Sequence, residues 1–236
     1  MTHPISISSY RSGHIQSSDQ SNGLQNCPRI EDDERSKAEK GILAGMVLEA
    51  QHAATVRKEP IQDFSQVSLS ELIEYIVRNH HDYIREEIPR LHALCEQVIA
   101  SRKWRNPELI DLARNLRRLS GDLTFHMSHT ESKVFPYIEA LERSRNDGSP
   151  LGPLSATQAE NLIEEVMVGH TPAGDTLKQI EADTNGFTPP EDACPDMVGL
   201  YDGLKELANK RSSHVQLEGY ILFPRALALE KEVLAA

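Results

Sequence analysis

The stretch HVQLEGYILFPRAL, from His214 to Leu227, decides the fold because it places a metal-ligand pattern on an amphipathic helix. Glu218 follows His214 by four residues, and on a helix this spacing puts both side chains on one face, one turn apart. The two side chains can therefore bind one metal cluster together. Imidazole suits iron, copper and zinc, while carboxylates bring negative charge and can bridge two ions. The pair favours two irons over a lone zinc.

A second copy of this pattern lies earlier in the chain, in HMSHTESKVFP from His126. In both copies a Phe-Pro pair follows the histidine by nine residues. Glu131 lies inside the earlier interval, as Glu218 does in the later one. The repeat indicates that two different helices supply ligands to one site.

One candidate histidine falls on each of four predicted helices, and successive members are 45, 44 and 44 residues apart: His81, His126, His170 and His214. In an up-down-up-down bundle, one helix plus one loop returns the chain to the same height, so these side chains can converge on one layer of the core. A lone helical histidine is usually solvated or hydrogen-bonded to protein, and a bundle whose histidines only pack is the alternative. The regular set favours a metal site.

The rest of the chain predicts an all-α protein, an antiparallel up-down four-helix bundle. Four long amphipathic segments run from about 68 to 100, 107 to 144, 155 to 183 and 195 to 229, with turn-rich loops and no β-rich runs. Ser68 and Glu71 have capping-box spacing at the first start. Pro89 lies inside the first helix and should bend it rather than end it.

Two regions divide the chain: an N-terminal extension over residues 1–65 and the bundle over 66–236. The extension begins with about 30 residues rich in Ser, Asn, Gln and Gly, which predicts a partly disordered arm. The apolar pattern of Asp32–Arg57 then predicts one helix.

Charge and composition exclude several classes of partner. The net charge of −11 gives no source of attraction for a phosphate backbone, so we expect no nucleic acid. The sequence shows no signal-peptide pattern and no run of about 18 apolar residues, which predicts a cytoplasmic protein without a membrane partner. Three scattered cysteines are read as thiols, not as a disulfide framework or a zinc site.

Several motifs together resemble the hemerythrin-like domain of the repair-of-iron-centres family, bacterial di-iron proteins tied to nitric oxide and oxidative stress. The resemblance covers roughly Ser68–Glu230 and is carried by HDYIREEIPRL, HMSHTESKVFP, GHTPAG, TPPEDAC and HVQLEGYILFPRAL. It implies two non-haem iron ions with a carboxylate bridge. The positions that match family ligands are His81, His126, His170, His214 and Glu218.

The chain departs from the family in three places. Family members place a bridging glutamate four residues after the second histidine, where this chain has Thr130, and Glu131 follows as the candidate ligand. The family's fifth imidazole ligand has no clear counterpart, so one iron is expected to have an open position or to be bound by His129. His80, about 100° around the helix from His81, is expected to serve the structure or to support a ligand from outside the ligand set. Many relatives carry two adjacent N-terminal cysteines, but this chain has only Cys27.

The resemblance implies a protein that binds nitric oxide or dioxygen at the di-iron centre and lowers or senses cytoplasmic nitric oxide under nitrosative stress. A first alternative is an iron donor that repairs damaged iron-sulfur clusters in client proteins, against which the missing cysteine pair counts. A second alternative is a reductase of nitric oxide or peroxide.

Overall fold

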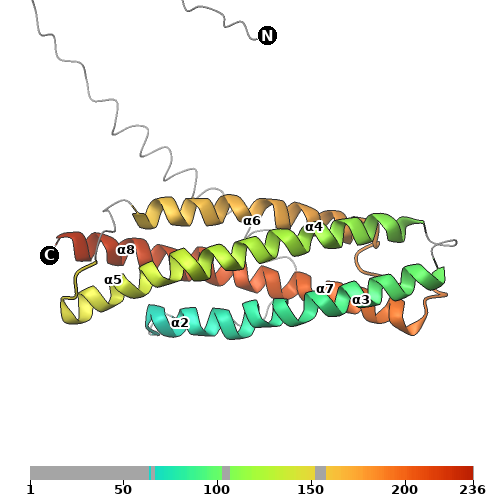
Figure 1. The fold of residues 1–236 in the computed structure, drawn as a ribbon, viewed down its shortest axis with the longest axis horizontal. Coiled ribbons are helices and arrows are strands. Elements are labelled where there is room, and N and C mark those ends of the chain that lie inside the picture. The colour runs from blue at the N-terminus through green and yellow to red at the C-terminus, as the bar shows by residue number, and fades with distance from the viewer. Residues whose placement is uncertain (1–63, 65–66, 103–106, 152–157, 236) are drawn as a thin grey trace, which may run out of the picture.

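The fold is an antiparallel bundle of four helical rods, as the sequence predicts (Figure 1). The structure is a computed structural model that describes residue 64 and residues 67–102, 107–151 and 158–235. The helix predicted for Asp32–Arg57, Cys27 and nearly all of the N-terminal extension lie outside the described residues. The chain runs up, down, up and down through the rods. The C-terminal helix α8 therefore finishes at the end of the bundle where α2 starts (Figure 1).

Three of the four described rods change from α-helix to π-helix and back. The first rod is α2 (Leu69–Ile76), η1 (Val77–His81) and α3 (Asp82–Arg102). The second is α4 (Glu108–His129), η2 (Thr130–Val134) and α5 (Phe135–Asp147). The third is the single helix α6 (Gln158–Asp183), and the fourth is α7 (Pro195–Gln216), η3 (Leu217–Leu222) and α8 (Phe223–Ala235).

The Phe-Pro pairs explain two of these π segments. Pro136 and Pro224 are the second residues of α5 and α8, directly after η2 and η3. A proline within a helix donates no hydrogen bond and its ring crowds the carbonyl four residues before it, which the wider π turn accommodates. The repeated sequence element therefore marks a local widening of each helix, one or two turns after its histidine.

The start of α2 is fixed by two carboxylates. Ser68 Oγ accepts a hydrogen bond from the Glu71 backbone N–H at 3.2 Å, and the Glu71 carboxylate accepts one from the Ser68 N–H at 3.0 Å, so the capping box is present. Glu142 of α5 accepts the N–H groups of Leu69 and Ser70 at 2.8 and 3.0 Å. This contact joins the first rod to the second at that end of the bundle.

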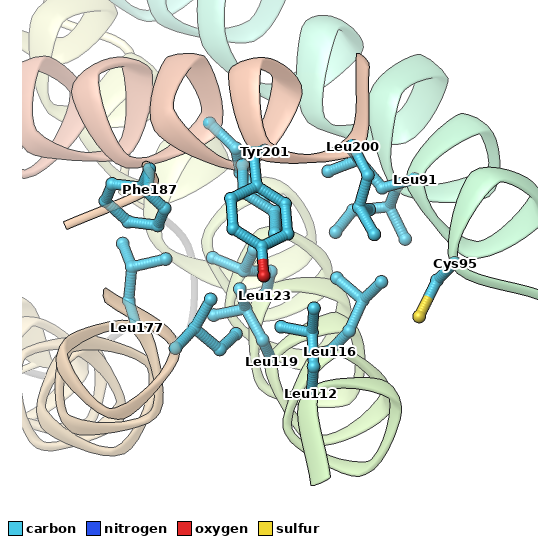
Figure 2. Close-up of a cluster of buried hydrophobic side chains, with 14 of the residues drawn as sticks. Leu91, Cys95, Leu112, Leu116, Leu119, Leu123, Leu177, Phe187, Leu200 and Tyr201 are labelled. Atoms are coloured by element: carbon cyan, nitrogen blue, oxygen red, sulfur yellow. The ribbon is translucent and has the colours of Figure 1, made fainter. Parts of the chain in front are cut away.

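Two apolar clusters fill the bundle, one toward each end. The cluster among α3, α4, α6 and α7 is rich in leucines and includes Phe187, Tyr201 and Cys95, and Figure 2 shows its labelled side chains gathered between the helices. The other cluster lies among α2, α5, α6 and α8. Buried histidines occupy the layer between the two clusters. Among the described helices, none combines the length and apolarity needed to cross a membrane.

Candidate metal centre

Five of the six predicted ligands meet in this buried layer. His81 ends η1, His126 lies in the last turn of α4, His170 lies in the middle of α6 and His214 lies in the last turn of α7. Glu218 is the second residue of η3. Each of the five residues is at most 4% exposed.

The two oxygens of Glu218 face different pairs of histidines. Oε1 lies 3.1 Å from His214 Nε2 and 4.0 Å from His81 Nε2. Oε2 lies 3.2 Å from His170 Nε2 and 3.4 Å from His126 Nε2. One carboxylate between two pairs of imidazoles can hold a carboxylate-bridged pair of metal ions.

The ring nitrogens themselves crowd together. His214 Nε2 lies 3.1 Å from His81 Nε2 and 3.4 Å from His126 Nε2. His81, His126, His214 and Glu218 each offer one ligand atom, and these four atoms all lie within 4.8 Å of one another. Glu218 Oε1 is buried and accepts no hydrogen bond from the described residues. A buried polar atom without a hydrogen-bond partner needs an explanation, and a bound cation supplies one.

Burial sets the protonation states that a metal needs. Desolvation lowers the pKa of His81 to about 4 and that of His170 to about 3, and it also lowers the pKa of His214. These imidazoles are neutral at pH 7 and keep a free lone pair. Burial alone would raise the pKa of Glu218, but His214 and His126 outweigh it and hold that pKa well below its usual value. The layer therefore presents neutral imidazoles and one anion.

Glu131, the sixth predicted ligand, is not brought into this group. Its Oε1 lies 2.5 Å from His81 Nδ1, the ring nitrogen on the side away from the cluster. Arg85 Nη2 donates to both of its oxygens, at 2.5 and 2.6 Å. Thr130 is fully buried, and its hydroxyl donates to the backbone carbonyls of His126 and Met127 at 3.1 Å.

Two further histidines lie beside the cluster rather than in it. The ring of His80 stacks on that of His214 with centroids 5.7 Å apart, and its Nδ1 lies 3.3 Å from the Lys210 carbonyl oxygen. His129, the possible extra ligand, points to Glu165 of α6, with Nε2 3.2 Å from the carboxylate. This placement agrees with the prediction that His80 serves the structure or supports a ligand from outside the ligand set.

Two arginines near the cluster were not identified from the sequence. Arg211 donates to the His170 carbonyl at 2.6 Å and, with His170, borders a small cavity beside the cluster. Arg85 follows His81 by four residues, so helical spacing could have placed it on the face of the first ligand. No comparable spacing signal connects Arg211, three residues before His214, to α6.

Comparison with known proteins identifies the family. Residues 72–226 match the profile described as "Hemerythrin HHE cation binding domain". The chain belongs to the hemerythrin family. It is 34% identical to the "Iron-sulfur cluster repair protein YtfE" of Cronobacter sakazakii and 33% identical to that of Escherichia coli O81, each over 185 residues, or 78% of both chains. The protein of the same description from an Enterobacter species is 33% identical over 178 residues, or 75% of both chains.

Membership of this family confirms the resemblance found in the sequence and places the chain with the repair-of-iron-centres proteins. Its cofactor is a carboxylate-bridged pair of non-haem irons, which the histidine and glutamate group accommodates. We propose His81, His126, His170, His214 and Glu218 as the residues that hold the two ions.

Proposed function

We propose that the protein supplies iron for the repair of damaged iron-sulfur clusters in other proteins. The observation that carries the proposal is the buried histidine layer bridged by Glu218, in a chain similar to named repair proteins over 78% of its length. The resemblance to the family implied nitric oxide binding as the main function. The printed names of the relatives support the repair alternative better.

The charges in the layer are suited to a metal that can leave. Two ferrous ions carry four positive charges, whereas Glu218 supplies the one carboxylate that faces inward among the described residues. Buried charge that is not balanced is costly. The neutral imidazoles bind the ions without neutralising them, so we expect at least one ion to exchange readily. Such an ion is cargo that a client protein can accept.

The test is reactivation of a hydratase whose [4Fe–4S] cluster has been damaged by peroxide. Full-length, iron-loaded protein should restore hydratase activity faster than the same amount of ferrous iron held by a weak chelator. Glu218→Gln, which removes the inward-facing charge, should bind less iron and restore little activity. His92→Gln is the matched control, because His92 lies on α3 outside the cluster and should reactivate like the parent protein. Reactivation no faster than with chelated iron would contradict the repair function.

A second candidate, binding of nitric oxide or dioxygen, is favoured by the small cavity beside the cluster. The cavity offers about 10 Å³ to a water-sized molecule and is bordered by His126, His170 and His214, with Ala173 and Arg211. That space is about the size of one water molecule, which is closer to the size of a diatomic ligand than to that of a larger substrate. When bound, the irons would supply electrons to such a ligand.

Ala173→Val tests this second candidate. The two added methyl groups should narrow the cavity with less disturbance of the core than a longer side chain would cause, so iron content should not change. Nitric oxide titrations of the ferrous protein, followed by optical spectra, should then show weaker or slower binding than in the parent. Equal binding in both proteins would exclude the cavity as the entry route.

A further inference from the structure

The carboxylate of Glu131 lies behind His81, on the side of the ring that faces away from the ligand atoms. Its Oε1 is 2.5 Å from His81 Nδ1, whereas the cluster is approached by His81 Nε2, which lies 3.1 Å from His214 Nε2. The two nitrogens are on opposite edges of one imidazole. A carboxylate that contacts Nδ1 therefore cannot at the same time bridge ions bound at Nε2.

Arg85 holds Glu131 in this position. Its Nη2 donates to both carboxylate oxygens, and its Nη1 donates to Asp82 at 2.8 Å. Hydrogen bonds between charged partners are strong and directional. The Glu131 side chain is 29% exposed, so its charge is partly solvated where it lies and would lose that solvation inside the layer.

In the part of the chain that the structure describes, no other carboxylate lies where a second bridging glutamate would be expected. Thr130, at the family's glutamate position, is fully buried with its hydroxyl bonded back to its own helix. The π segment η2 starts at Thr130, where the helix widens. Among the described residues, Glu218 is the one carboxylate in the group of ligand atoms.

We infer that Glu131 is a positioning residue that orients His81, and that Glu218 alone bridges the two irons among the described carboxylates. The His81 Nδ1–H donates to Glu131, which fixes the tautomer with the Nε2 lone pair toward the metal. A hydrogen bond to the outer nitrogen of a metal-binding histidine orients the ring and raises its basicity. Arg85 acts one step further out, by holding Glu131. The inference rests on the proposed ligand set and not on cluster repair.

Three variants separate positioning from ligation. Glu131→Gln keeps an oxygen that accepts the Nδ1–H, Glu131→Ala removes it, and Arg85→Gln releases the carboxylate. Glu165→Gln is the matched control, because Glu165 also pairs with a histidine, His129, but outside the cluster. Circular dichroism verifies that each full-length variant is folded, as expected for residues that are partly exposed.

Anaerobic competition with a chromogenic ferrous chelator measures affinity and the iron count. We expect Glu131→Ala to weaken the more labile site by about 10- to 100-fold, the usual loss on removing such an outer partner. Glu131→Gln should restore most of that affinity, with two irons per chain and the Mössbauer spectrum of the parent. Arg85→Gln should weaken binding by about tenfold or less, and Glu165→Gln should leave it unchanged.

The tautomer provides an independent readout on the metal-free protein. Long-range ¹H–¹⁵N spectra should show His81 with its proton on Nδ1 in the parent and in Glu131→Gln, and a mixture of tautomers in Glu131→Ala. Loss of one iron from Glu131→Gln, or tighter binding in Arg85→Gln, would show that Glu131 is a ligand and overturn the inference. A His81 proton on Nε2 in the parent would do the same. Hydratase reactivation is absent from these readouts, so the inference and the repair function can fail separately.

Discussion

Replacing His214 with Ala should remove one iron and leave the bundle folded. His214 Nε2 is the central nitrogen of the layer, 3.1 Å from both Glu218 Oε1 and His81 Nε2. Without His214, the donors that remain on the Oε1 side of Glu218, among the described residues, are Oε1 itself and His81 Nε2, which lies 4.0 Å from it. On the other side, His126, His170 and Oε2 are intact. The iron content should therefore fall from about two per chain to about one.

The same substitution should lower the stability of the bundle only slightly. The two apolar clusters lie on either side of the histidine layer and supply the packing of the four rods. Losing one buried side chain costs on the order of 1–3 kcal/mol, within a total stability of about 5–15 kcal/mol for a domain. The helices depend mainly on this packing, so the variant should keep nearly all of its helical content.

The assay combines elemental analysis of purified protein with far-ultraviolet circular dichroism. His92→Ala is the control, since it removes a histidine from α3 outside the cluster. His170→Ala should also leave about one iron, from the opposite side of Glu218. Two irons per chain in His214→Ala would exclude this histidine as a ligand, and loss of both irons would contradict the division of the layer into two halves.

Two further predictions concern stability in the metal-free protein. Leu119 is fully buried in the cluster of Figure 2, and its replacement by Ala should lower the free energy of unfolding, measured with urea, by about 2–5 kcal/mol. The variant should still bind iron like the parent when it is reloaded. Altered iron content would mean that the apolar cluster and the histidine layer are coupled. Acidification should destabilise the metal-free protein below pH 6.5, because His80 and His81, with pKa values of about 4, stay neutral when folded and take up protons when unfolded. For each of these two histidines the loss of stability approaches about 1.4 kcal/mol per pH unit and ends near pH 4. A flat melting temperature between pH 6.5 and 5 would refute the prediction.

The bundle could be predicted because its signals are periodic. Four long amphipathic segments and their turn-rich connections gave the correct rods, and the Ser68 and Glu71 pair gave the correct first start. The π segments were not predicted, although the Phe-Pro pairs that follow two of them were noticed. A proline inside a helical pattern indicates a local disturbance, but whether the helix kinks, ends or widens depends on the neighbouring rods.

The meeting of the four histidines was predictable for the same reason, and the contacts around them were not. Equal spacing along the chain becomes equal height in a bundle, so the four histidines lie in one layer, as predicted. Which edge of an imidazole a carboxylate contacts depends on helix rotation and on competing partners from other rods. Arg85 and Glu131 lie 46 residues apart on different rods, and their contact has no signature in local spacing.

The position of Glu131 shows how a one-residue shift can change the role of a carboxylate. On a regular α-helix, the residue four after His126 shares its face, whereas the residue five after it lies about 100° further round. The chain has Thr130 at the first position and Glu131 at the second, and in the π segment that begins at Thr130 the Glu131 carboxylate contacts His81 and Arg85. The layer then keeps the four imidazoles and Glu218 but loses one negative charge. Under the proposed repair function, we expect the smaller negative charge around the ions to make their release to a client protein easier.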